Sequence, residues 1–203
     1  MIDLKLNSSA DLRKEGKSFY WASFFLPKSY KKNAGTLYSI CRYFDDIADK
    51  YSEDQTIYLK NSIEEIRTNK NNKVNIFLQK NKINNLIFID LIEGLILDQK
   101  KIRIQNKEEL IKYSYHVAGT VGLMMSKIIG VKHEKAARSA IDLGIGMQLT
   151  NIARDVYEDS KMKRIYLPAN LIPDISLKNL TDLHNKSSEK DERISNAIHK
   201  VIT

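Results

Sequence analysis

The amino-acid sequence predicts an all-α protein built as a bundle of helices. Apolar side chains recur at the three- and four-residue spacing of amphipathic helices along nearly the whole chain. Only eight glycines and three prolines interrupt the 203 residues, so long helices can form. No β-rich block, internal repeat or domain boundary is visible, which favours a single helical domain over residues 1–203.

Each predicted helix has its own signal in the chain. Ser8 and Asp11 are spaced like a capping box, which predicts a first helix that ends before Leu26-Pro27. Residues 29–50 carry apolar side chains at near-helical spacing and predict the second helix. Residues 70–73 form a polar connector. The same periodicity predicts helices at 54–68, 83–98, 108–130 and 134–158, followed by a weakly amphipathic stretch at 187–203.

Composition and charge bound the class of protein. The net charge of +8 is compatible with a nucleic acid, an anionic lipid or a phosphorylated substrate as partner. The lysines are interleaved with asparagines rather than with aromatic residues, so a nucleic-acid-binding helical protein would rest on charge alone, and we expect no nucleic-acid partner. The lone Cys41 excludes an internal disulfide and is consistent with a reducing compartment.

The chain shows no secretory or membrane-spanning signal. Residues 1–5 lack a basic region followed by an apolar run. The most apolar stretch, residues 86–97, contains Asp90 and Glu93 and is too short to cross a bilayer. We therefore expect a cytoplasmic protein, with peripheral attachment to the inner face of a membrane as an open alternative.

An acidic cluster lies near the end of the predicted helix at 29–50. Asp45 and Asp49 are four residues apart and fall on one helix face, which Tyr38 and Arg42 share. Carboxylates in apolar sequence are rarely buried unless they are paired or bind a metal. An arginine beside them suits a phosphate that already carries a metal ion. The alternative is a solvated acidic patch near a helix end.

A second polar stripe crosses the apolar helix at 134–158. Its members recur at helical spacing and carry oxygen atoms that hard cations prefer. Arg154 and Arg164 lie close by in the chain. A buried polar network that holds helices in register is the alternative. The members of the stripe are Gln148, Asn151, Asp155 and Asp159.

The two acidic clusters are about a hundred residues apart and can face each other across a helical cavity with Mg²⁺ between them. Magnesium is usually held by one or two carboxylates together with substrate phosphates, so the arrangement predicts diphosphate chemistry. Between the clusters, Tyr113 and His116 on one predicted helix could orient a leaving group, although Tyr113 taken alone is better explained as a hydrogen-bonded core tyrosine. Gly119 and Gly122 permit close helix packing or a local break.

Four segments in order resemble the squalene/phytoene synthase family, whose members join two prenyl diphosphates head to head. Lys17-Ser18-Phe19, followed by Leu26-Pro27, resembles the N-terminal phosphate-contacting segment of the family. The remaining matches are residues 38–49, which resemble the first Asp-rich motif, residues 113–125, which resemble the central helix, and residues 148–159 with 164–168, which are the most specific match.

The resemblance implies an isoprenoid-synthase-type helical bundle around a central cavity, and roles for individual residues. Mg²⁺, or Mn²⁺ in its place, would be bound by the aspartates of both motifs, and Tyr113 would assist ionisation and proton handling. The implied metal ligands are Asp45, Asp49, Asn151, Asp155 and Asp159, and the implied diphosphate-binding residues are Lys17, Ser18, Tyr38, Arg42, Gln148, Asn151, Arg154 and Arg164.

The motifs are most similar to those of bacterial phytoene synthases. The predicted activity is condensation of two geranylgeranyl diphosphates, through a cyclopropylcarbinyl diphosphate, to phytoene, a step in carotenoid biosynthesis. The alternatives are synthesis of squalene, with NADPH as cofactor, or of presqualene diphosphate from farnesyl diphosphate, and a non-catalytic truncated paralogue that binds prenyl diphosphate or a partner. Two differences from the family stand out: Lys163 replaces a common glycine, and the chain stops at Thr203, before several helices that family members possess.

Overall fold

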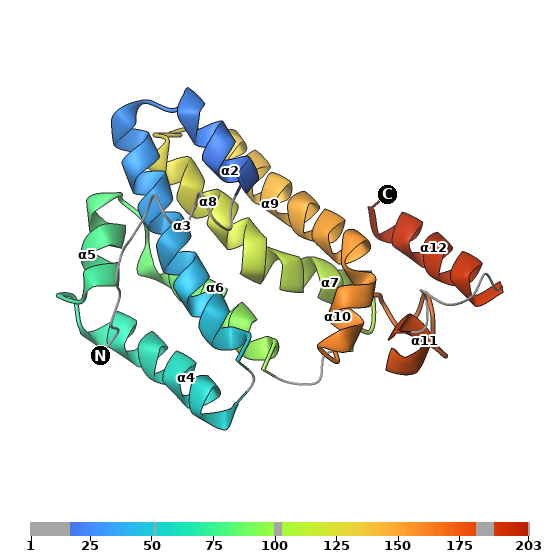
Figure 1. Cartoon of the computed structure of the whole chain (residues 1–203). Helices are drawn as coiled ribbons and strands as arrows, with labels where there is room; N and C mark the ends of the chain where they lie inside the picture. The colour runs from blue at the N-terminus through green and yellow to red at the C-terminus, as the bar shows by residue number, and fades with distance from the viewer. Residues whose placement is uncertain (1–16, 51, 100–102, 182–188, 203) are drawn as a thin grey trace.

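The computed structural model describes residues 17–50, 52–99, 103–181 and 189–202. These residues form a layered bundle of helices, which confirms the predicted all-α class (Figure 1). Within these ranges there is no β-strand, and the only extended pairing is one parallel bridge between Arg103 and Ile165. The predicted capping box at Ser8 and Asp11 lies outside the described residues.

The first part of the chain follows the predicted order of helices closely. The helices predicted at 29–50, 54–68 and 83–98 are present with ends shifted by one to two residues. The elements are α2 (Lys17–Ala22), the 3₁₀ turn η1 (Ser23–Phe25), α3 (Lys28–Ala48), α4 (Glu53–Thr68), α5 (Lys73–Lys80) and α6 (Asn85–Leu97).

Helix α5 was not predicted, and a local asparagine network explains why it forms. The Asn72 side chain accepts a hydrogen bond from the backbone N–H of Asn75 at 2.7 Å and so caps the helix. The Asn75 amide donates to the carbonyl of Ile66 at 2.7 Å, which ties α5 to the end of α4. Val74 and Leu78 are buried. The polar connector predicted at 70–73 is present as a turn over residues 70–72, and its asparagines also organise the start of α5.

The second part of the chain contains one correction to the predicted elements. The helix predicted at 108–130 is present but carries a π-helical segment, and the helix predicted at 134–158 ends at Arg154. Asp155 has φ −101° and ψ 17°, which breaks the helix into two. The elements are α7 (Lys107–Ser114), the π-helix η2 (Tyr115–Gly119), α8 (Thr120–Ile128), α9 (Glu134–Arg154), α10 (Val156–Lys161), α11 (Leu177–Thr181) and α12 (Glu189–Ile202).

Two hydrophobic clusters hold the bundle together. The first joins α3, α4, α5, α6 and α8, and at its centre the rings of Phe44 and Phe88 meet edge to face at 5.4 Å. The second lies around the end of α9 and includes Leu110, Ile152 and Val201 from α7, α9 and α12. Burial of these side chains is the main favourable term for packing the helices. The Arg164–Asp49 ion pair links the two clusters, since Asp49 follows Ala48 of the first and Arg164 precedes Ile165 of the second.

Helix α9 runs beside η2 and α8, and two glycines allow the close approach (Figure 1). A Cβ atom at Gly122 would lie 2.1 Å from the carbonyl oxygen of Ala140, and one at Gly144 would lie 2.4 Å from that of Ala118. Both distances are far below van der Waals contact, and the obstructing atoms belong to the backbone. The predicted packing role of Gly122 is therefore confirmed, and Gly144 shares it.

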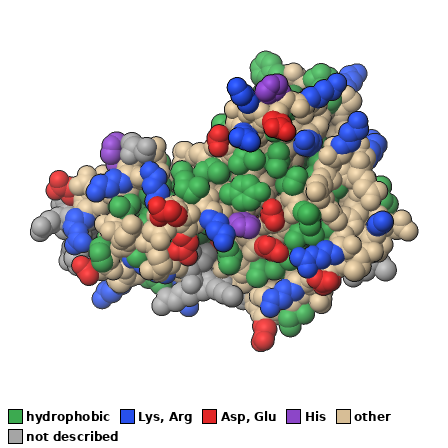
Figure 2. Space-filling model, turned by 180° about the vertical axis from the view of Figure 1, so that it is seen from behind, with side chains coloured by type: hydrophobic (Ala, Val, Ile, Leu, Met, Phe, Trp, Pro, Cys, Tyr) green, Lys and Arg blue, Asp and Glu red, His purple; other side chains and the backbone are tan. Residues whose placement is uncertain are grey.

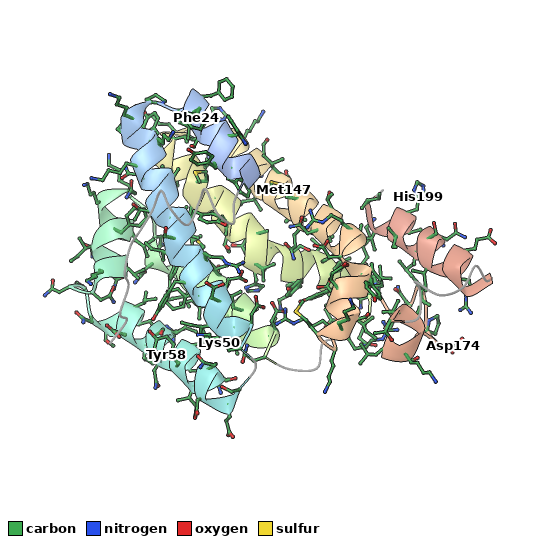
Figure 3. The ribbon with its side chains drawn as sticks, in the orientation of Figure 1. Phe24, Lys50, Tyr58, Met147, Asp174 and His199 are labelled. Atoms are coloured by element: carbon green, nitrogen blue, oxygen red, sulfur yellow. The ribbon has the colours of Figure 1, made fainter. Side chains whose placement is uncertain are left out.

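The surface mixes charge with exposed apolar side chains. On the face shown in Figure 2, Lys and Arg side chains are interspersed with Asp and Glu, and hydrophobic side chains gather near the centre. Phe24 of η1 and Met147 of α9 are both exposed (Figure 3), as are Trp21 (70%) and Phe25 (91%). Among the described residues, none of the helices combines the length and the apolar character that crossing a bilayer requires.

We expect Gly144→Ala to lower the free energy of unfolding by about 1–3 kcal/mol, because the added methyl group has no space against the backbone of η2. Gly146→Ala in the same helix is the matched control, since a Cβ there meets nothing within 4 Å. It should raise stability by about 0.5–1 kcal/mol, as alanine favours a helix over glycine. Urea unfolding measures both, and equal effects of the two variants would contradict the close approach.

Candidate active site

Three aspartates occupy the same structural position, the C-terminal end of a helix. Asp49 caps α3, Asp98 caps α6 and Asp155 caps α9. The exposed carbonyl groups at a helix C-terminus make that end partly negative, so a carboxylate placed there is unfavourable unless a cation lies close. The bundle thus gathers negative charge at the helix ends and needs positive partners for it.

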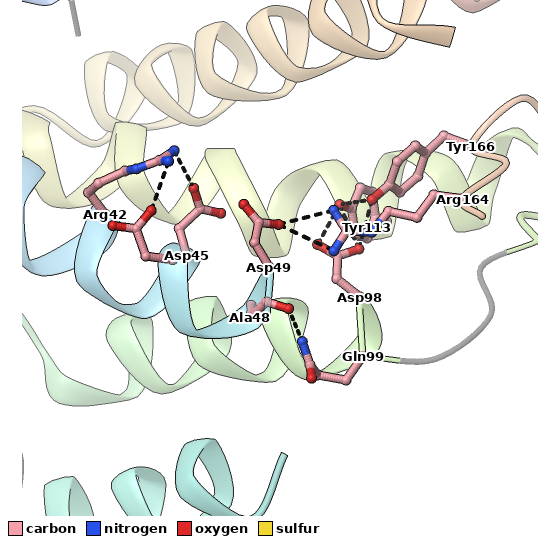
Figure 4. A network of polar contacts seen from close by, with 10 residues as sticks. Arg42, Asp45, Ala48, Asp49, Asp98, Gln99, Tyr113, Arg164 and Tyr166 are labelled. Atoms are coloured by element: carbon pink, nitrogen blue, oxygen red, sulfur yellow. Dashed lines mark hydrogen bonds and ion pairs between the residues drawn. The ribbon is translucent and has the colours of Figure 1, made fainter. Parts of the chain in front are cut away.

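Arg164 supplies one of these partners. Its Nη1 and Nη2 atoms lie 3.2 and 3.3 Å from Oδ1 of Asp49, across 115 positions of sequence. The Arg164 side chain is only 6% exposed, whereas that of Asp49 is 44% exposed, so the ion pair lies at the boundary between the interior and solvent. Gln99 adds a link between the ends of α6 and α3, because its Nε2 donates to the carbonyl of Ala48 (Figure 4). The predicted residues Asp49 and Arg164 are therefore brought together.

Arg42 neutralises the acidic cluster within α3. Its Nη1 lies 2.9 Å from Oδ2 of Asp45, and its Nη2 lies 2.7 Å from Oδ1 of Asp46. Burial, followed by the negative charge of Asp49, raises the pKa of the Asp45 carboxyl to about 6. The repulsion between Asp45 and Asp49 shows that this pair favours an added cation.

The second acidic pair lies on the two sides of the helix break. Asp155 ends α9, and Asp159 lies one turn into α10 with its N–H donating to the Asp155 carbonyl at 2.8 Å. Arg154 pairs with Asp155 through Nε and Nη2, both at 2.6 Å. Burial, followed by the charge of Asp155, raises the pKa of the Asp159 carboxyl to about 7. This pair also favours an added cation.

A buried polar centre joins the two parts of the site, and the sequence analysis did not identify it. Asp98, 7% exposed, accepts hydrogen bonds from the hydroxyl groups of Tyr113 and Tyr166 (Figure 4). Burial raises the pKa of Asp98 to about 6, although Arg164 and the two phenols act in the opposite direction. A signal was present in the chain: an aspartate ends an otherwise apolar helix, where a basic residue is usually favoured.

The remaining predicted residues are placed as follows. Tyr38 is half-buried on α3, with its ring 6.4 Å from that of Phe19. Gln148 and Asn151 are half-buried on α9, two turns and one turn before Asp155, respectively. Lys17 and Ser18 begin α2, but their side chains lie outside the described part of the structure.

The donor set suits a hard divalent cation. Each acidic pair offers carboxylate oxygens whose mutual repulsion a cation would relieve, and Mg²⁺ commonly takes one or two carboxylates together with phosphate oxygens. Among the described residues, no three or more His, Cys, Asp or Glu side chains converge in a metal-binding group. The residues therefore fit a metal bound by one pair together with substrate, rather than a cage made by protein alone.

A tight turn brings Arg164 into the site. The N–H of Arg164 donates to the Asp159 carbonyl at 2.9 Å, and that of Lys163 donates to the Ser160 carbonyl at 3.0 Å. Lys163 has φ +62°, in the left-handed region that glycine adopts readily. This conformation explains why a glycine before the arginine is suitable here.

Comparison with known proteins agrees with this geometry. The profile of the squalene/phytoene synthase family matches residues 12–203. A 15-cis-phytoene synthase of Enterobacter agglomerans is 32% identical over 192 residues, covering 85% of this chain and 65% of the relative. A phytoene synthase of Thermus thermophilus is 34% identical over 172 residues, covering 79% and 58%. The chain thus spans less than two thirds of the length of these curated relatives.

Solved structures share the fold. A crystal structure of a dehydrosqualene synthase in complex with a ligand superposes with a TM-score of 0.80 at 27% identity, over 95% of this chain and 71% of that one. A squalene synthase from Alicyclobacillus acidocaldarius gives a TM-score of 0.76 at 19% identity, over 98% and 82%, which supports the fold alone. The isoprenoid-synthase-type bundle implied by the sequence motifs is confirmed.

We expect Lys163→Gly to raise the free energy of unfolding by about 1 kcal/mol, because glycine removes the steric cost of positive φ at this turn. Lys163→Ala is the control, since it removes the charge and the long side chain but keeps a Cβ atom. Its stability should stay close to that of the original protein. Chemical denaturation of the three proteins measures the difference, and equal gains from both variants would exclude the backbone explanation.

The raised pKa of Asp159 predicts a pH dependence of stability in metal-free buffer. The folded protein, with a pKa of about 7 for this group against 3.8 ordinarily, binds more protons than the unfolded chain between these values. The stabilisation of the folded state that comes from protonated Asp159 is therefore fully present below pH 3.8, the ordinary pKa of the group. It is lost as the pH rises through about 7. Asp159→Asn mimics the protonated form, so its stability relative to the original protein should increase across this range. Urea unfolding in EDTA tests this, and a pH-independent difference would refute it.

Proposed function

The chain belongs to the squalene/phytoene synthase family, and from this membership we propose that it catalyses head-to-head condensation of two prenyl diphosphates. The substrates we favour are two geranylgeranyl diphosphates, joined through a cyclopropylcarbinyl diphosphate to give phytoene. The observation that carries the proposal is the set of three aspartates at three helix C-termini, with Arg164 paired with Asp49 and Arg154 with Asp155. The names of the relatives support phytoene as product.

The arginines provide positive charge for the diphosphate groups. Arg42 and Arg164 lie beside Asp45 and Asp49, and Arg154 lies beside Asp155. A guanidinium group binds phosphate oxygens as readily as carboxylates, so each can exchange partners when a diphosphate enters. Negative charge that develops on the departing diphosphate is then stabilised by groups already in place.

Mg²⁺ would be held by Asp45 and Asp49 and by Asn151, Asp155 and Asp159, and would supply Lewis-acid stabilisation of the leaving diphosphate. In our proposal the aspartates orient that cation, while the arginines complete the neutralisation of charge. Burial, followed by the charge of the neighbouring aspartate, raises the pKa of Asp45 and of Asp159, which supports this assignment. Tyr113 would lie beside the reacting carbon atoms and assist their ionisation.

Apolar surface near the site would accommodate the prenyl chains and exclude water from a carbocation. Exposed Phe24 of η1 and Met147 of α9 are candidates for this surface (Figure 3). Trp21 and Phe25, close in the chain to Lys28, would also suit the boundary of an anionic membrane, where aromatic rings and lysines are favoured. We therefore propose a cytoplasmic location with peripheral attachment to the membrane that stores the lipid substrate.

A second product class also has support. The dehydrosqualene synthase that shares 27% identity with the chain points to farnesyl-derived C30 products. The distinguishing experiment incubates the purified protein with geranylgeranyl or farnesyl diphosphate and Mg²⁺, with and without NADPH, and analyses the extracted lipids by mass. A C40 product without NADPH supports phytoene synthesis, and a C30 product assigns the chain to the squalene branch. Tight binding of substrate without turnover would indicate a non-catalytic paralogue.

We expect Asp45→Asn and Asp155→Asn each to reduce product formation by about 10³-fold or more, because a ligand that stabilises the leaving group is lost. The free energy of unfolding should stay equal or rise, since each change removes a repelling charge. Asp142→Asn is the matched control, because Asp142 is an exposed carboxylate on α9. The same lipid assay and urea unfolding measure the outcomes, and full activity in either site variant would contradict the assignment.

A further inference from the structure

Asp98 connects three segments that are distant in the chain. It ends α6 and lies almost completely buried. The Tyr113 hydroxyl of α7 lies 3.0 Å from both of its carboxylate oxygens, and the Tyr166 hydroxyl lies 2.9 Å from Oδ1 (Figure 4). A buried carboxylate must have such partners, and here both donors are phenols.

The geometry leaves Tyr113 little freedom. Its ring stacks on that of Tyr166 with centroids 5.0 Å apart and planes inclined by 27°. Its oxygen also lies 3.1 Å from the Tyr166 oxygen, so ring and hydroxyl are both held. The helix alone would not fix this direction, because the π-helical segment η2 begins two residues after Tyr113 and changes the register of the side chains.

The network reaches the diphosphate side of the site through Arg164. Arg164 binds Asp49 at the end of α3, and Tyr166 follows it by two residues. Asp98 and Asp49 are thus the two acidic ends of one chain of contacts that runs from α6, through the segment 164–166, to α3 (Figure 4). A displacement of Asp98 would move the phenol relative to the residues that hold the leaving group.

We propose that Asp98 is a positioning residue that fixes the Tyr113 phenol for the condensation, acting through Tyr113 and making no contact with substrate. This inference rests on the proposed function, in which Tyr113 lies beside the reacting prenyl groups. While Tyr113 directs its proton to Asp98, its oxygen presents lone pairs, and not a proton, to the site. Such an oxygen stabilises a developing carbocation through its dipole without transferring a proton to it.

A double-mutant cycle tests the inference, because residues that act through one another are not additive. The variants are Asp98→Asn, Tyr113→Phe and the combination of both, each in the full chain with Mg²⁺ and prenyl diphosphate. We expect Asp98→Asn to lower kcat by about 100-fold through loss of alignment, with KM unchanged within about twofold. In the Tyr113→Phe background, the same change should cause no further loss.

The matched control is Asp90→Asn. Asp90 lies two turns earlier on α6, and its carboxylate also accepts a tyrosine hydroxyl, that of Tyr115, at 3.4 Å. This variant should keep the turnover of the original protein. The positioning role would be overturned if Asp98→Asn kept full turnover. It would also be overturned if the separate effects of Asp98→Asn and Tyr113→Phe on kcat multiplied in the combined variant.

If Asp98→Asn does not fold, Tyr166→Phe replaces it in the cycle, because that change keeps the carboxylate and removes one donor. We then expect Tyr166→Phe to lower kcat in the original protein and to cause no further loss in the Tyr113→Phe background. If Tyr166→Phe lowers kcat equally in both backgrounds, or in neither, the inference is overturned. Binding of Mg²⁺ with inorganic pyrophosphate, measured by calorimetry, should remain within about twofold in each folded variant, since the diphosphate-binding residues are unchanged.

The same measurements separate this inference from the proposed function. An original protein without turnover and without binding of Mg²⁺ and pyrophosphate would overturn both. An active original protein with an equally active Asp98→Asn variant would overturn the positioning role alone.

Discussion

Negative charge collected at helix C-termini, inside a largely apolar bundle, is the constraint on which the site depends. Asp49, Asp98 and Asp155 each end a helix whose own dipole already makes that end negative. Repulsion of this kind is tolerated only where cations are close. Arg164 meets the requirement at Asp49 and Arg154 meets it at Asp155. Asp98 is held by two phenol hydroxyls and feels the charge of Arg164. The same excess of negative charge makes the helix ends suitable for metal-bound diphosphate.

The packing of the bundle serves this arrangement. Two backbone contacts set the distance between α9 and the helix before it. Helix α9 meets α8 at Gly122 and η2 at Gly144, and both contacts are possible only because these residues lack a side chain. The hydrogen bond from Gln99 to Ala48 joins the ends of α6 and α3. Apolar burial thus holds the helices, while a few polar links determine which of their ends meet.

The local patterns allowed much of the fold and part of the site to be predicted. The helical periodicity and the i, i+4 spacing of Asp45 and Asp49 depend only on neighbouring residues, and the structure reproduces both.

The break at Asp155 was missed because Ile152 and Val156 continue the apolar pattern across it, although the backbone of Asp155 departs from the helix. Helix α5 was missed because the asparagines at its start read as part of a connector. The capping bond of Asn72 and the bonds of the Asn75 amide to the carbonyls of Ile66 and Asn69 become visible only in the folded chain.

By itself, the sequence determined the class of fold, the order of most helices and the chemical character of the motifs, since these follow from side-chain type and helical spacing. The tertiary structure decided which charges meet. The Arg164–Asp49 ion pair spans 115 positions, and the bonds of Asp98 to Tyr113 and Tyr166 join α6, α7 and the segment after α10. No local pattern encodes such contacts, because they arise only when the packing of several helices brings their ends to one place and excludes water from between them.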